Sequence, residues 1–553
     1  MGVDFVHFNG MTGEFYYSEH MGGGAALFDM DQDGDLDLYL TQGRLIGPGK
    51  TLGDAVFPPT EGAFLGDRLY RNDLVEGPEG QRTLRFTEVT TESGLGLEDN
   101  SMGVAVGDVD GNGFPDLFVT TWDSPNRLYL NRGPDASGVV TFEDVTETAG
   151  VGNRRWAIAA AFVDYDRDGR LDLYVGNYLD YELATHKECT NNLGLLDYCG
   201  PASYRAVRDV LYRNLGPGDD GVVRFSDVTA EAGVVESPAA ALGVVSGDFD
   251  GDGWSDLYIA NDEFPNHLLM NQRNGRFRDE ALLSGSAMNA EGKAEAGMGV
   301  DAADGDGDGD LDLFVAHLTE ETNTLYVNQG GLFEDRTTQS DLALPSFEFT
   351  GFGAVFLDYD NDRRPDLMVA NGAIRGTPEG LARQEPFPLA QRNQLFHNLG
   401  NGRFAEASSS AGPAFEREAV SRGLAKGDLD NDGDTDVVVV NNAGPVEVLL
   451  NEVGQDRPWV GLRLVTGDGR DALGAEVVLP GVDDGATLHR VKTDGSYASA
   501  HDPRLLLALP GEDPVAEILV RWPDGRQERF SNLDARRYNT IRQGTGQAAE
   551  ATP

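Results

Sequence analysis

A short acidic pattern occurs seven times along the 553-residue chain and constrains its fold more than any other feature. Each run has Asp at places 1, 3 and 9, Asp or Asn at place 5 and, in six runs, Gly at place 6, and an apolar segment follows. Such a repeat predicts an array of similar units, because each unit buries its apolar face only against its neighbours. The first Asp residues of the runs are Asp29, Asp108, Asp164, Asp248, Asp304, Asp358 and Asp428.

The sequence around each acidic run also repeats. A Gly/Ala-rich apolar segment precedes the run and a β-rich segment follows it, and two further segments complete the unit, as in 68–72 (RLYRN) and 85–90 (RFTEVT). Each unit therefore contains four short predicted strands, with the acidic run as the loop between the first two. Four-stranded units repeated in this way predict the blades of a β-propeller, an all-β fold.

The number of strands predicts how the ring closes. The sequence has seven first, second and third strands but only six fourth strands, and it passes from Asn451 directly into GQDRPW. The segment Val3–Phe8 is a candidate for the missing strand. Because a ring closed by this segment leaves no open sheet edge, we predict a seven-bladed propeller over residues 1–453.

The acidic runs have the residue types and spacing of a calcium site. Ca²⁺ prefers about six to eight oxygen ligands, which Asp side chains at places 1, 3, 5 and 9 and a main-chain carbonyl at place 7 can supply, whereas Mg²⁺ keeps its waters and demands octahedral geometry. Gly at place 6 permits the sharp turn. Asp and Gly also favour simple turns, but clustered carboxylates repel one another without a cation.

The predicted metal-ligating positions are Asp29, Asp31, Asp33, Asp35, Asp37, Asp108, Asp110, Asn112, Phe114, Asp116, Asp164, Asp166, Asp168, Arg170, Asp172, Asp248, Asp250, Asp252, Trp254, Asp256, Asp304, Asp306, Asp308, Asp310, Asp312, Asp358, Asp360, Asp362, Arg364, Asp366, Asp428, Asp430, Asp432, Asp434 and Asp436. Two runs depart from the pattern. Asn112 keeps an oxygen ligand with one less charge, whereas the sixth run has Arg363 in place of Gly. A guanidinium there can partly replace the ion, so we expect six or seven calcium ions.

The charge of the chain excludes two classes of partner. Asp and Glu number 93 against 43 Lys and Arg, which gives a formal net charge of −50. Nucleic acid binding requires a basic surface that neutralises phosphates, and anionic lipid repels such a chain. No apolar run approaches the ~18 residues of a membrane-spanning helix. No charged-then-apolar leader opens the sequence, so we expect that the signal has been removed if the protein is exported.

A second β-rich region begins at Trp459, after the repeats end. Its segments, such as 459–467 (WVGLRLVTG) and 516–525 (AEILVRWPDG), predict a small antiparallel, sandwich-like β-domain over 456–545. We expect the polar tail 546–553 to be disordered.

These motifs resemble two known families. The acidic runs with their flanking strands resemble the FG-GAP (VCBS-type) blades of integrin α-subunit propellers, which implies Ca²⁺ binding by the loop between the first two strands. Residues 472–478 (ALGAEVV), 494–509 (DGSYASAHDPRLLLAL) and 520–526 (VRWPDGR) resemble the ASPIC/UnbV domain. The combination resembles the cartilage acidic protein family, whose relatives include many secreted bacterial proteins, extracellular matrix and neuronal proteins, and UnbV-type proteins of enediyne clusters.

The two cysteines of the chain, Cys189 and Cys199, lie in a long insertion of the third blade. A local disulfide is the leading interpretation, and it implies an oxidising compartment, so that the protein is secreted, periplasmic or on the cell surface. A thiolate metal site with His186 and a pair of free thiols remain as alternatives. No CxxC pair supports a structural zinc site.

The long insertions are predicted to share one face of the propeller. In an up-and-down blade the acidic loops lie at one end, whereas the insertions 42–66, 178–208 and 371–392 and the segment 9–23 lie at the other. Together they would bring one group of polar and aromatic residues into a working face, here called the insertion face. These residues are Tyr16, Tyr17, Glu19, His20, His186, Tyr198 and His317.

No catalytic motif occurs in the sequence. The weak catalytic candidates are His7, His20, His186, Tyr198 and His317, although a single histidine is more often a surface or hydrogen-bonded residue than a ligand, and His7 falls in a predicted strand. The leading hypothesis is a secreted, calcium-binding propeller that acts as a protein- or glycan-binding or adhesion module. The alternative is an enzyme or biosynthetic accessory protein with a site on the insertion face. A third is a scaffold that presents the C-terminal domain.

Overall fold

The computed structural model describes residues 1–77, 82–191, 194–234, 237–376, 383, 388–480, 486–511 and 515–549. Within these residues the repeats form six four-stranded antiparallel sheets and a seventh sheet of three strands, and each sheet is a blade. The all-β class is confirmed. The last predicted tail residues, 550–553, lie outside the described part of the chain.

The strands of each blade are given in order from the axis outward. Blade 1 contains β1 (Ala25–Phe28), β2 (Asp37–Leu40), β3 (Arg68–Asn72) and β6 (Phe86–Glu88), and blade 2 contains β7 (Asn100–Gly107), β8 (Asp116–Trp122), β9 (Arg127–Pro134) and β10 (Val140–Asp144). Blade 3 contains β11 (Ala157–Val163), β12 (Asp172–Asn177), β15 (Val210–Pro217) and β16 (Val223–Asp227), and blade 4 contains β17 (Ala241–Gly247), β18 (Asp256–Asn261), β19 (His267–Asn271) and β20 (Phe277–Asp279). Blade 5 contains β21 (Val300–Ala303), β22 (Asp312–Val315), β23 (Thr324–Asn328) and β24 (Phe333–Asp335). Blade 6 contains β25 (Gly351–Leu357), β26 (Asp366–Asn371), β28 (Gln394–Gly400) and β29 (Arg403–Glu406). Blade 7 contains β31 (Ser421–Gly427), β32 (Asp436–Asn441) and β33 (Glu447–Leu449).

The first strands of the blades surround a common axis. Each first strand packs against the first strand of the next blade, and β31 of blade 7 packs against β1 of blade 1. Hydrophobic clusters fill the spaces between neighbouring blades, as between blades 1 and 2, where Tyr39 and Leu117 are fully buried. Both faces of an inner strand are therefore covered, which explains why all eight residues of β7 are buried and why these strands are apolar runs without alternation.

The predicted closing segment lies beside blade 7 but forms only one bridge. Val6 pairs with Pro445, the His7 N–H donates to the Gly444 carbonyl at 2.8 Å, and the Val446 N–H donates to the Phe5 carbonyl at 3.1 Å. This segment thus occupies the place of a fourth strand next to β33. It forms no regular strand because Pro445 has no N–H to donate to a ladder.

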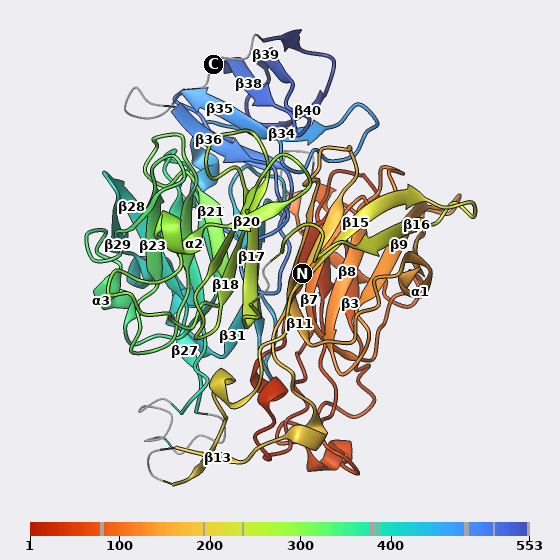
Figure 1. Ribbon diagram of the computed structural model, residues 1–553. Coiled ribbons are helices and arrows are strands. Elements are labelled where there is room, and N and C mark those ends of the chain that lie inside the picture. Colours follow the sequence, from red (N-terminus) through yellow and green to blue (C-terminus); the bar gives the residue numbers. More distant parts are fainter. Residues whose placement is uncertain are drawn as a thin grey trace.

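The two ends of the propeller carry different structures (Figure 1). The C-terminal domain covers the end with the acidic loops, and the insertion around β13 (Cys189–Thr190), which pairs with β14 (Leu196–Asp197), extends from the opposite end. The remaining short elements are β4 (Val75–Glu76), β5 (Arg82–Thr83), β27 (Gln391–Arg392), β30 (Glu418–Ala419), α1 (Thr146–Ala149), α2 (Ala281–Ser284), α3 (Ala343–Ser346), η1 (Tyr17–His20), η2 (Leu52–Asp54), η3 (Leu183–Thr185), η4 (Pro201–Ser203), η5 (Ser408–Ser410), η6 (Pro413–Glu416) and η7 (Gly454–Asp456).

The C-terminal domain consists of two sheets that enclose an apolar core. One sheet contains β37 (Leu505–Ala508), β34 (Trp459–Val465) and β40 (Tyr538–Arg542), and the other contains β36 (Ala486–Arg490), β35 (Glu476–Pro480), β38 (Val515–Arg521), β39 (Gln527–Leu533) and β41 (Gln547–Ala548). The domain was predicted to be antiparallel, but β34 pairs with β40 in parallel. This pairing is possible because nearly the whole domain connects the two strands. β41 also extends the domain beyond the expected boundary at residue 545.

One segment of the C-terminal domain fills the channel along the propeller axis. We call residues 493–502 the plug. Ser496 and Ala500 form β-bridges with Val300 of blade 5 and Ala26 of blade 1, and the Val104 N–H of blade 2 donates to the Ala498 carbonyl. The plug therefore replaces solvent at the axis with main-chain pairing to several blades.

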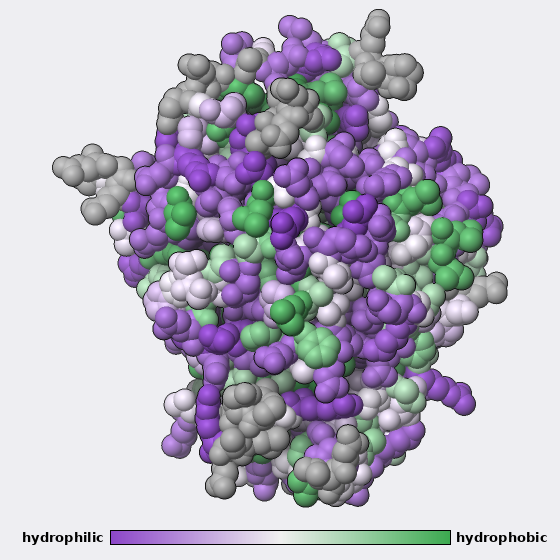
Figure 2. All heavy atoms as spheres, turned by 90° about the vertical axis from the view of Figure 1, so that its left-hand side faces the viewer, coloured by the Kyte–Doolittle hydropathy of each residue, from purple (hydrophilic) through white to green (hydrophobic). Residues whose placement is uncertain are grey.

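One face of the molecule is strongly hydrophilic. Hydrophilic side chains cover most of the face in Figure 2, and hydrophobic side chains form small separate groups on it. No described helix is long and apolar enough to cross a membrane.

Candidate metal centres and the insertion face

Each acidic run folds into a tight loop around its first Asp. The main-chain N–H at place 6 donates to a carboxylate oxygen of the place-1 Asp in all seven loops, at 2.7–3.1 Å. The residue at place 6 has a positive φ in each loop, from +76° to +98°. Glycine adopts this backbone region without a steric penalty, so its recurrence at place 6 has a conformational cause, whereas Arg363 adopts it with strain.

The carboxylates of these loops converge. In loops 1 to 4, three Asp side chains offer oxygens that lie within 4.8 Å of one another. In loop 4, for example, Asp248, Asp250 and Asp256 form such a group. Burial raises the pKa of Asp248 to about 7 and the pKa of Asp256 well above its ordinary value. Deprotonated carboxylates packed this closely need a cation nearby.

The donor set fits a hard divalent cation. Asp164 Oδ1, Asp360 Oδ1 and Asp434 Oδ1 are buried and have no hydrogen-bond partner among the described residues. Such orphaned oxygens are costly in a protein interior unless a ligand satisfies them. The place-5 side chains accept from the N–H at place 7, for example Asp252 from Trp254 at 2.8 Å and Asn112 from Phe114 at 2.8 Å. Carboxylates of this kind are the ligands that Ca²⁺ prefers.

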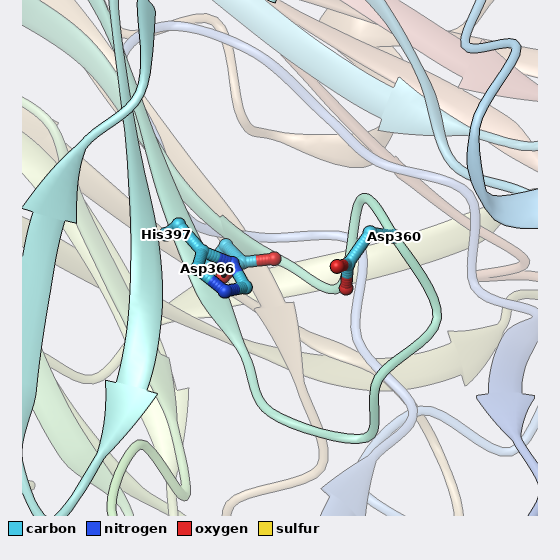
Figure 3. Close-up of side chains that lie close together, drawn as sticks. All are labelled: Asp360, Asp366 and His397. Carbon is cyan, nitrogen blue, oxygen red and sulfur yellow. Dashed lines mark hydrogen bonds and ion pairs between the residues drawn. The ribbon is translucent and has the colours of Figure 1, made fainter. Parts of the chain in front are cut away.

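The sixth loop has a different set of side chains (Figure 3). Asp360, Asp366 and His397 form a group of possible ligand atoms, and His397 Nδ1 lies 3.2 Å from Asp366 Oδ1. The Asp360 carboxylate faces this pair across the loop. Burial raises the pKa of Asp366 to about 9. The sequence prediction missed His397, which precedes the final Asn of the third strand and could have been found at that fixed place.

Asparagines at the ends of the third strands connect each loop to the neighbouring blade. The N–H of each Asn donates to the place-9 Asp of its own blade at 2.6–2.9 Å. Its side-chain Nδ2 donates to the place-2 carbonyl of the preceding blade's loop at 2.6–2.9 Å. These residues are Asn72, Asn131, Asn214, Asn271, Asn328, Asn398 and Asn451. An Asn ends the third-strand segment of every repeat, as in 68–72 (RLYRN), but the sequence pattern does not indicate its role.

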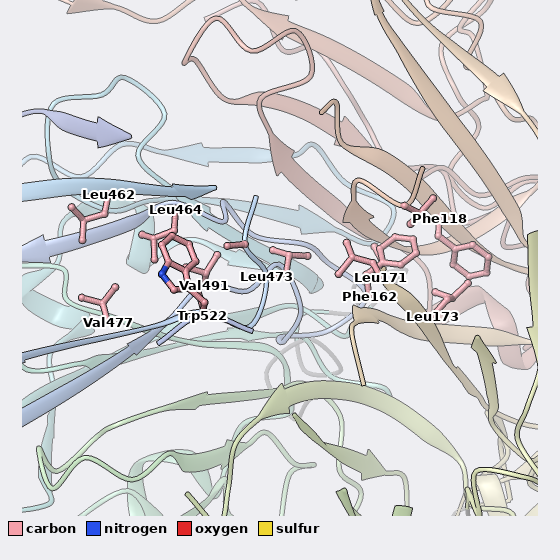
Figure 4. Close-up of a cluster of buried hydrophobic side chains, with 14 of the residues drawn as sticks. Phe118, Phe162, Leu171, Leu173, Leu462, Leu464, Leu473, Val477, Val491 and Trp522 are labelled. Carbon is pink, nitrogen blue, oxygen red and sulfur yellow. The ribbon is translucent and has the colours of Figure 1, made fainter. Parts of the chain in front are cut away.

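The C-terminal domain contacts the acidic loops directly. The Leu488 N–H donates to Asp304 Oδ2 at 3.0 Å, and the Tyr538 hydroxyl donates to Asp428 Oδ2 at 3.0 Å. An apolar core also continues from blades 2 and 3 into the domain, where Leu473 lies between Leu171 and the residues around Trp522 (Figure 4). The loops thus contribute to two interfaces, between blades and with the domain.

The insertion face brings together most of the residues assigned to it. Tyr17 and Tyr178 share a hydrogen bond of 2.8 Å, and the Tyr198 hydroxyl donates to Glu19 Oε2 at 2.9 Å. His20 packs against Tyr198, with ring centroids 4.5 Å apart.

His186 lies beside this group, since its Nδ1 is 3.2 Å from the Tyr181 hydroxyl and its ring packs on Tyr16. His317 lies apart, beside Glu295, with Nε2 3.8 Å from Oε2. His7 is buried where the Ala443 N–H donates to its Nδ1.

Burial keeps His7 and His20 neutral. Burial, with a smaller contribution from the Arg422 cation, lowers the pKa of His7 and of His20 to about 3. Burial raises the pKa of Glu19 to about 7. A cavity bounded by Tyr17, His20 and Tyr198 has a volume of about 20 Å³, which is room for about one water molecule.

Cys189 and Cys199 form a disulfide, with their Cα atoms 5.2 Å apart. The predicted disulfide is confirmed, and the alternatives of a thiolate metal site and of free thiols are wrong. The bond joins the ends of the β13–β14 ribbon within the insertion of the third blade.

Comparisons with known proteins agree with these features. A model described as FG-GAP-like repeat matches residues 108–175, 248–315, 304–369 and 388–439, and a model described as ASPIC and UnbV matches residues 465–548. Cartilage acidic protein 1 of Xenopus tropicalis is 26% identical over 529 residues, which cover 91% of this chain and 70% of the relative. The mouse protein of the same name is 25% identical over 530 residues, with the same shares covered.

Solved structures with similar arrangements include two lectins. One, from Agrocybe aegerita, is described as recognising non-reducing terminal N-acetylglucosamine; it is 16% identical, has a TM-score of 0.37, and the match covers 70% of this chain and 89% of the lectin. The other, BP39L from Burkholderia pseudomallei, is 8% identical with a TM-score of 0.42, and the match covers 78% of this chain and 95% of the lectin. The chain thus has FG-GAP-like repeats followed by an ASPIC/UnbV domain, and its sequence is similar to the cartilage acidic proteins over most of its length.

Proposed function

We propose that this protein is a secreted, calcium-stabilised propeller that binds a protein or glycan partner. The observation that carries the proposal is the hydrogen-bonded loop geometry that all seven acidic loops share. The place-1 Asp accepts the place-6 N–H in every loop, and in four loops three carboxylates converge on one point. Oxygen ligands in this arrangement suit Ca²⁺.

The ions would act on the structure rather than on a substrate. The loops lie between the blades and the C-terminal domain, so that neutralising their carboxylates strengthens both interfaces. The disulfide supports the extracellular part of the proposal, because such bonds persist in oxidising compartments. With six or seven ions, the formal charge of the chain remains strongly negative.

The insertion face is the proposed partner surface. Its loops carry exposed apolar side chains, among them Leu195 at 61% and Leu196 at 53% exposure beside the disulfide, and Leu52 at 44%. Contiguous exposed apolar groups that are rimmed by polar residues mark sites that bind other proteins or ligands. The cavity within this face admits about one water, so a partner would dock on its surface.

Two measurements test the proposal. Elemental analysis of the dialysed protein should find six or seven calcium ions per chain, and excess EGTA should lower the melting temperature, because each ion that binds only the folded state adds RT ln(1 + [Ca²⁺]/Kd). An unchanged melting temperature in EGTA contradicts calcium binding. Glycan arrays and pull-downs with the wild type and a Leu195→Asp, Leu196→Asp variant test the surface, and equal retention of a partner by both proteins would place the site elsewhere.

A further inference from the structure

A cavity of about 550 Å³ lies between the C-terminal domain and blades 5 to 7. Leu488 of β36 and Leu505 and Leu507 of β37 line it from the domain side, and Phe356 and Arg363 line it from the propeller side. Its volume falls in the range of ~300–1,000 Å³ that is typical of small-molecule sites, which are mostly apolar with a few placed polar groups. The sixth and seventh acidic loops border this space, whereas the insertion face lies at the opposite end of the propeller.

Two lysines at the cavity wall share one carboxylate. Lys426 of β31 and Lys492 both line the cavity. Lys426 Nζ lies 3.4 Å from Asp301 Oδ2, and Lys492 Nζ donates to Asp301 Oδ1. Asp301 is fully buried, whereas the Lys426 side chain remains 23% exposed. Two cations against one carboxylate leave an excess positive charge in the interior, which is costly without an anion.

The other charged residues that line the cavity do not remove this excess, and the buried carboxyl of Asp494, whose pKa burial raises despite the nearby Lys492 cation, accepts a hydrogen bond from Ser246 Oγ. Arg490 lies 3.7 Å from Glu476, and Arg504 lies 3.0 Å from Asp502, so both arginines are paired. Glu517 pairs with Arg529 at 2.6 Å. The remaining carboxylates are those of Asp358 and Asp428, the place-1 residues of the sixth and seventh loops, whose charge a loop cation would neutralise.

Positively charged side chains gather at this cavity wall although the chain as a whole is strongly acidic. The chain has only five lysines, and two of them line the cavity. Arg363 is the residue that replaces Gly at place 6, where its φ of +76° is strained for an L-residue. It also lines the cavity. The substitution that breaks the repeat in the sixth loop therefore also places a guanidinium at the cavity wall.

We propose that the cavity binds a small amphipathic anion. The apolar body of the ligand packs among the leucines of β36 and β37, and its anionic group, a carboxylate or a sulfonate, pairs with Lys426 and Lys492. The site is independent of the partner surface on the insertion face, and it links the C-terminal domain to the propeller because each lysine comes from a different one of the two.

The test uses the full calcium-loaded chain and the fluorescent probe anilinonaphthalene sulfonate. We expect saturable binding of one probe per chain, displaced by decanoate at much lower concentration than by decan-1-ol, because only decanoate carries an anion. Lys426→Met removes one charge and should weaken probe binding about tenfold or more. Ala508→Phe, at another lining residue, should abolish binding by filling the cavity.

Lys293→Met is the matched control, since the Lys293 side chain is 61% exposed and pairs with Glu321. Calcium content and melting temperature verify that each variant is folded, and the competition between decanoate and decanol is measured on the wild type and needs no variant. No saturable binding, or an unchanged affinity of folded Ala508→Phe, overturns the site. Equal displacement by decanoate and decanol overturns the anionic part. The charge balance at the cavity rests on the proposed calcium in the sixth and seventh loops. Failure of calcium binding appears in elemental analysis as a chain without calcium, whereas failure of this site appears as a calcium-loaded chain that does not bind the probe.

Discussion

The side chain of Asn72 in the first blade donates a hydrogen bond to the main-chain carbonyl of Leu429 in the last blade, at 2.9 Å across 357 residues of sequence. The same contact recurs at every blade boundary, so this one joins the two ends of the ring. It also lies next to the first loop, because the Asn72 N–H donates to Asp37 Oδ1 at 2.9 Å. Ring closure and loop geometry therefore depend on the same residue.

Asn72→Ala should destabilise the whole propeller. The change leaves the buried Leu429 carbonyl without its donor, which costs about 1–3 kcal/mol, and the cost should appear as a lower melting temperature. Asn274→Ala is the control, because Asn274 is an exposed residue in the turn between the third and fourth strands of blade 4. If both variants melt at the same temperature, the asparagine contact does not hold the ring together.

Asp432→Ala should destabilise the protein in calcium but not in EGTA. Asp432 is half-buried beside Asp430, and burial followed by the Asp430 charge raises its pKa to about 6. In EGTA, removal of one repelling carboxylate should leave the variant as stable as the wild type or more stable. In calcium, the variant should bind one ion fewer and melt at a lower temperature. Calorimetry and elemental analysis, with the exposed Asp219→Ala as control, give the comparison; an unaltered calcium content removes the seventh site from the proposal.

Glu19→Gln should change how stability depends on pH. Burial raises the pKa of Glu19 from 4.5 to about 7 in the folded chain, so between these pH values the folded state holds a proton that the unfolded state has lost. Stability therefore falls as pH rises through this window, by about 3 kcal/mol for a shift of this size.

The variant cannot titrate at this position, so its stability relative to the wild type should increase from pH 5 to pH 8 in denaturant titrations. The exposed Glu291→Gln should follow the wild-type curve at each pH. A constant difference between Glu19→Gln and the wild type would show that Glu19 stays ionised in the folded protein.

Tyr497→Ala should loosen the C-terminal domain from the propeller. Tyr497 is fully buried in the plug, its hydroxyl donates to the Met21 carbonyl at 2.6 Å, and its ring meets Phe352 edge-on. Truncating a buried aromatic side chain costs about 3–5 kcal/mol, whereas Tyr497→Phe removes only the hydrogen bond and should cost about 1 kcal/mol. Limited proteolysis should cut between the domains more rapidly in Tyr497→Ala; equal cleavage of all three proteins would mean that the plug does not hold the domain.

The repeats made part of this structure predictable from local sequence. Asp248, Gly253 and Asp256 stand at fixed places in one short run, so their spacing alone predicts a turn in which carboxylates converge. The disulfide was predictable for a related reason, because Cys189 and Cys199 lie only ten positions apart in the sequence. In each case the contacts lie within one loop, and the chain has few other ways to satisfy them.

The rest depended on contacts between distant segments. Local sequence predicts a strand at Val3–Phe8, but the partner of Val6 is Pro445, which cannot complete a ladder. His397 joins the sixth loop only because a third strand packs beside it.

By itself, the sequence determined an all-β chain of repeated blades with acidic loops, because those features follow from periodicity and local turn chemistry. The tertiary structure alone decided that the plug fills the channel, that Asn72 reaches Leu429, and that Lys426 and Lys492 share Asp301. Residues far apart in the chain meet there through the packing of whole blades and domains, and no local pattern records which of them will meet.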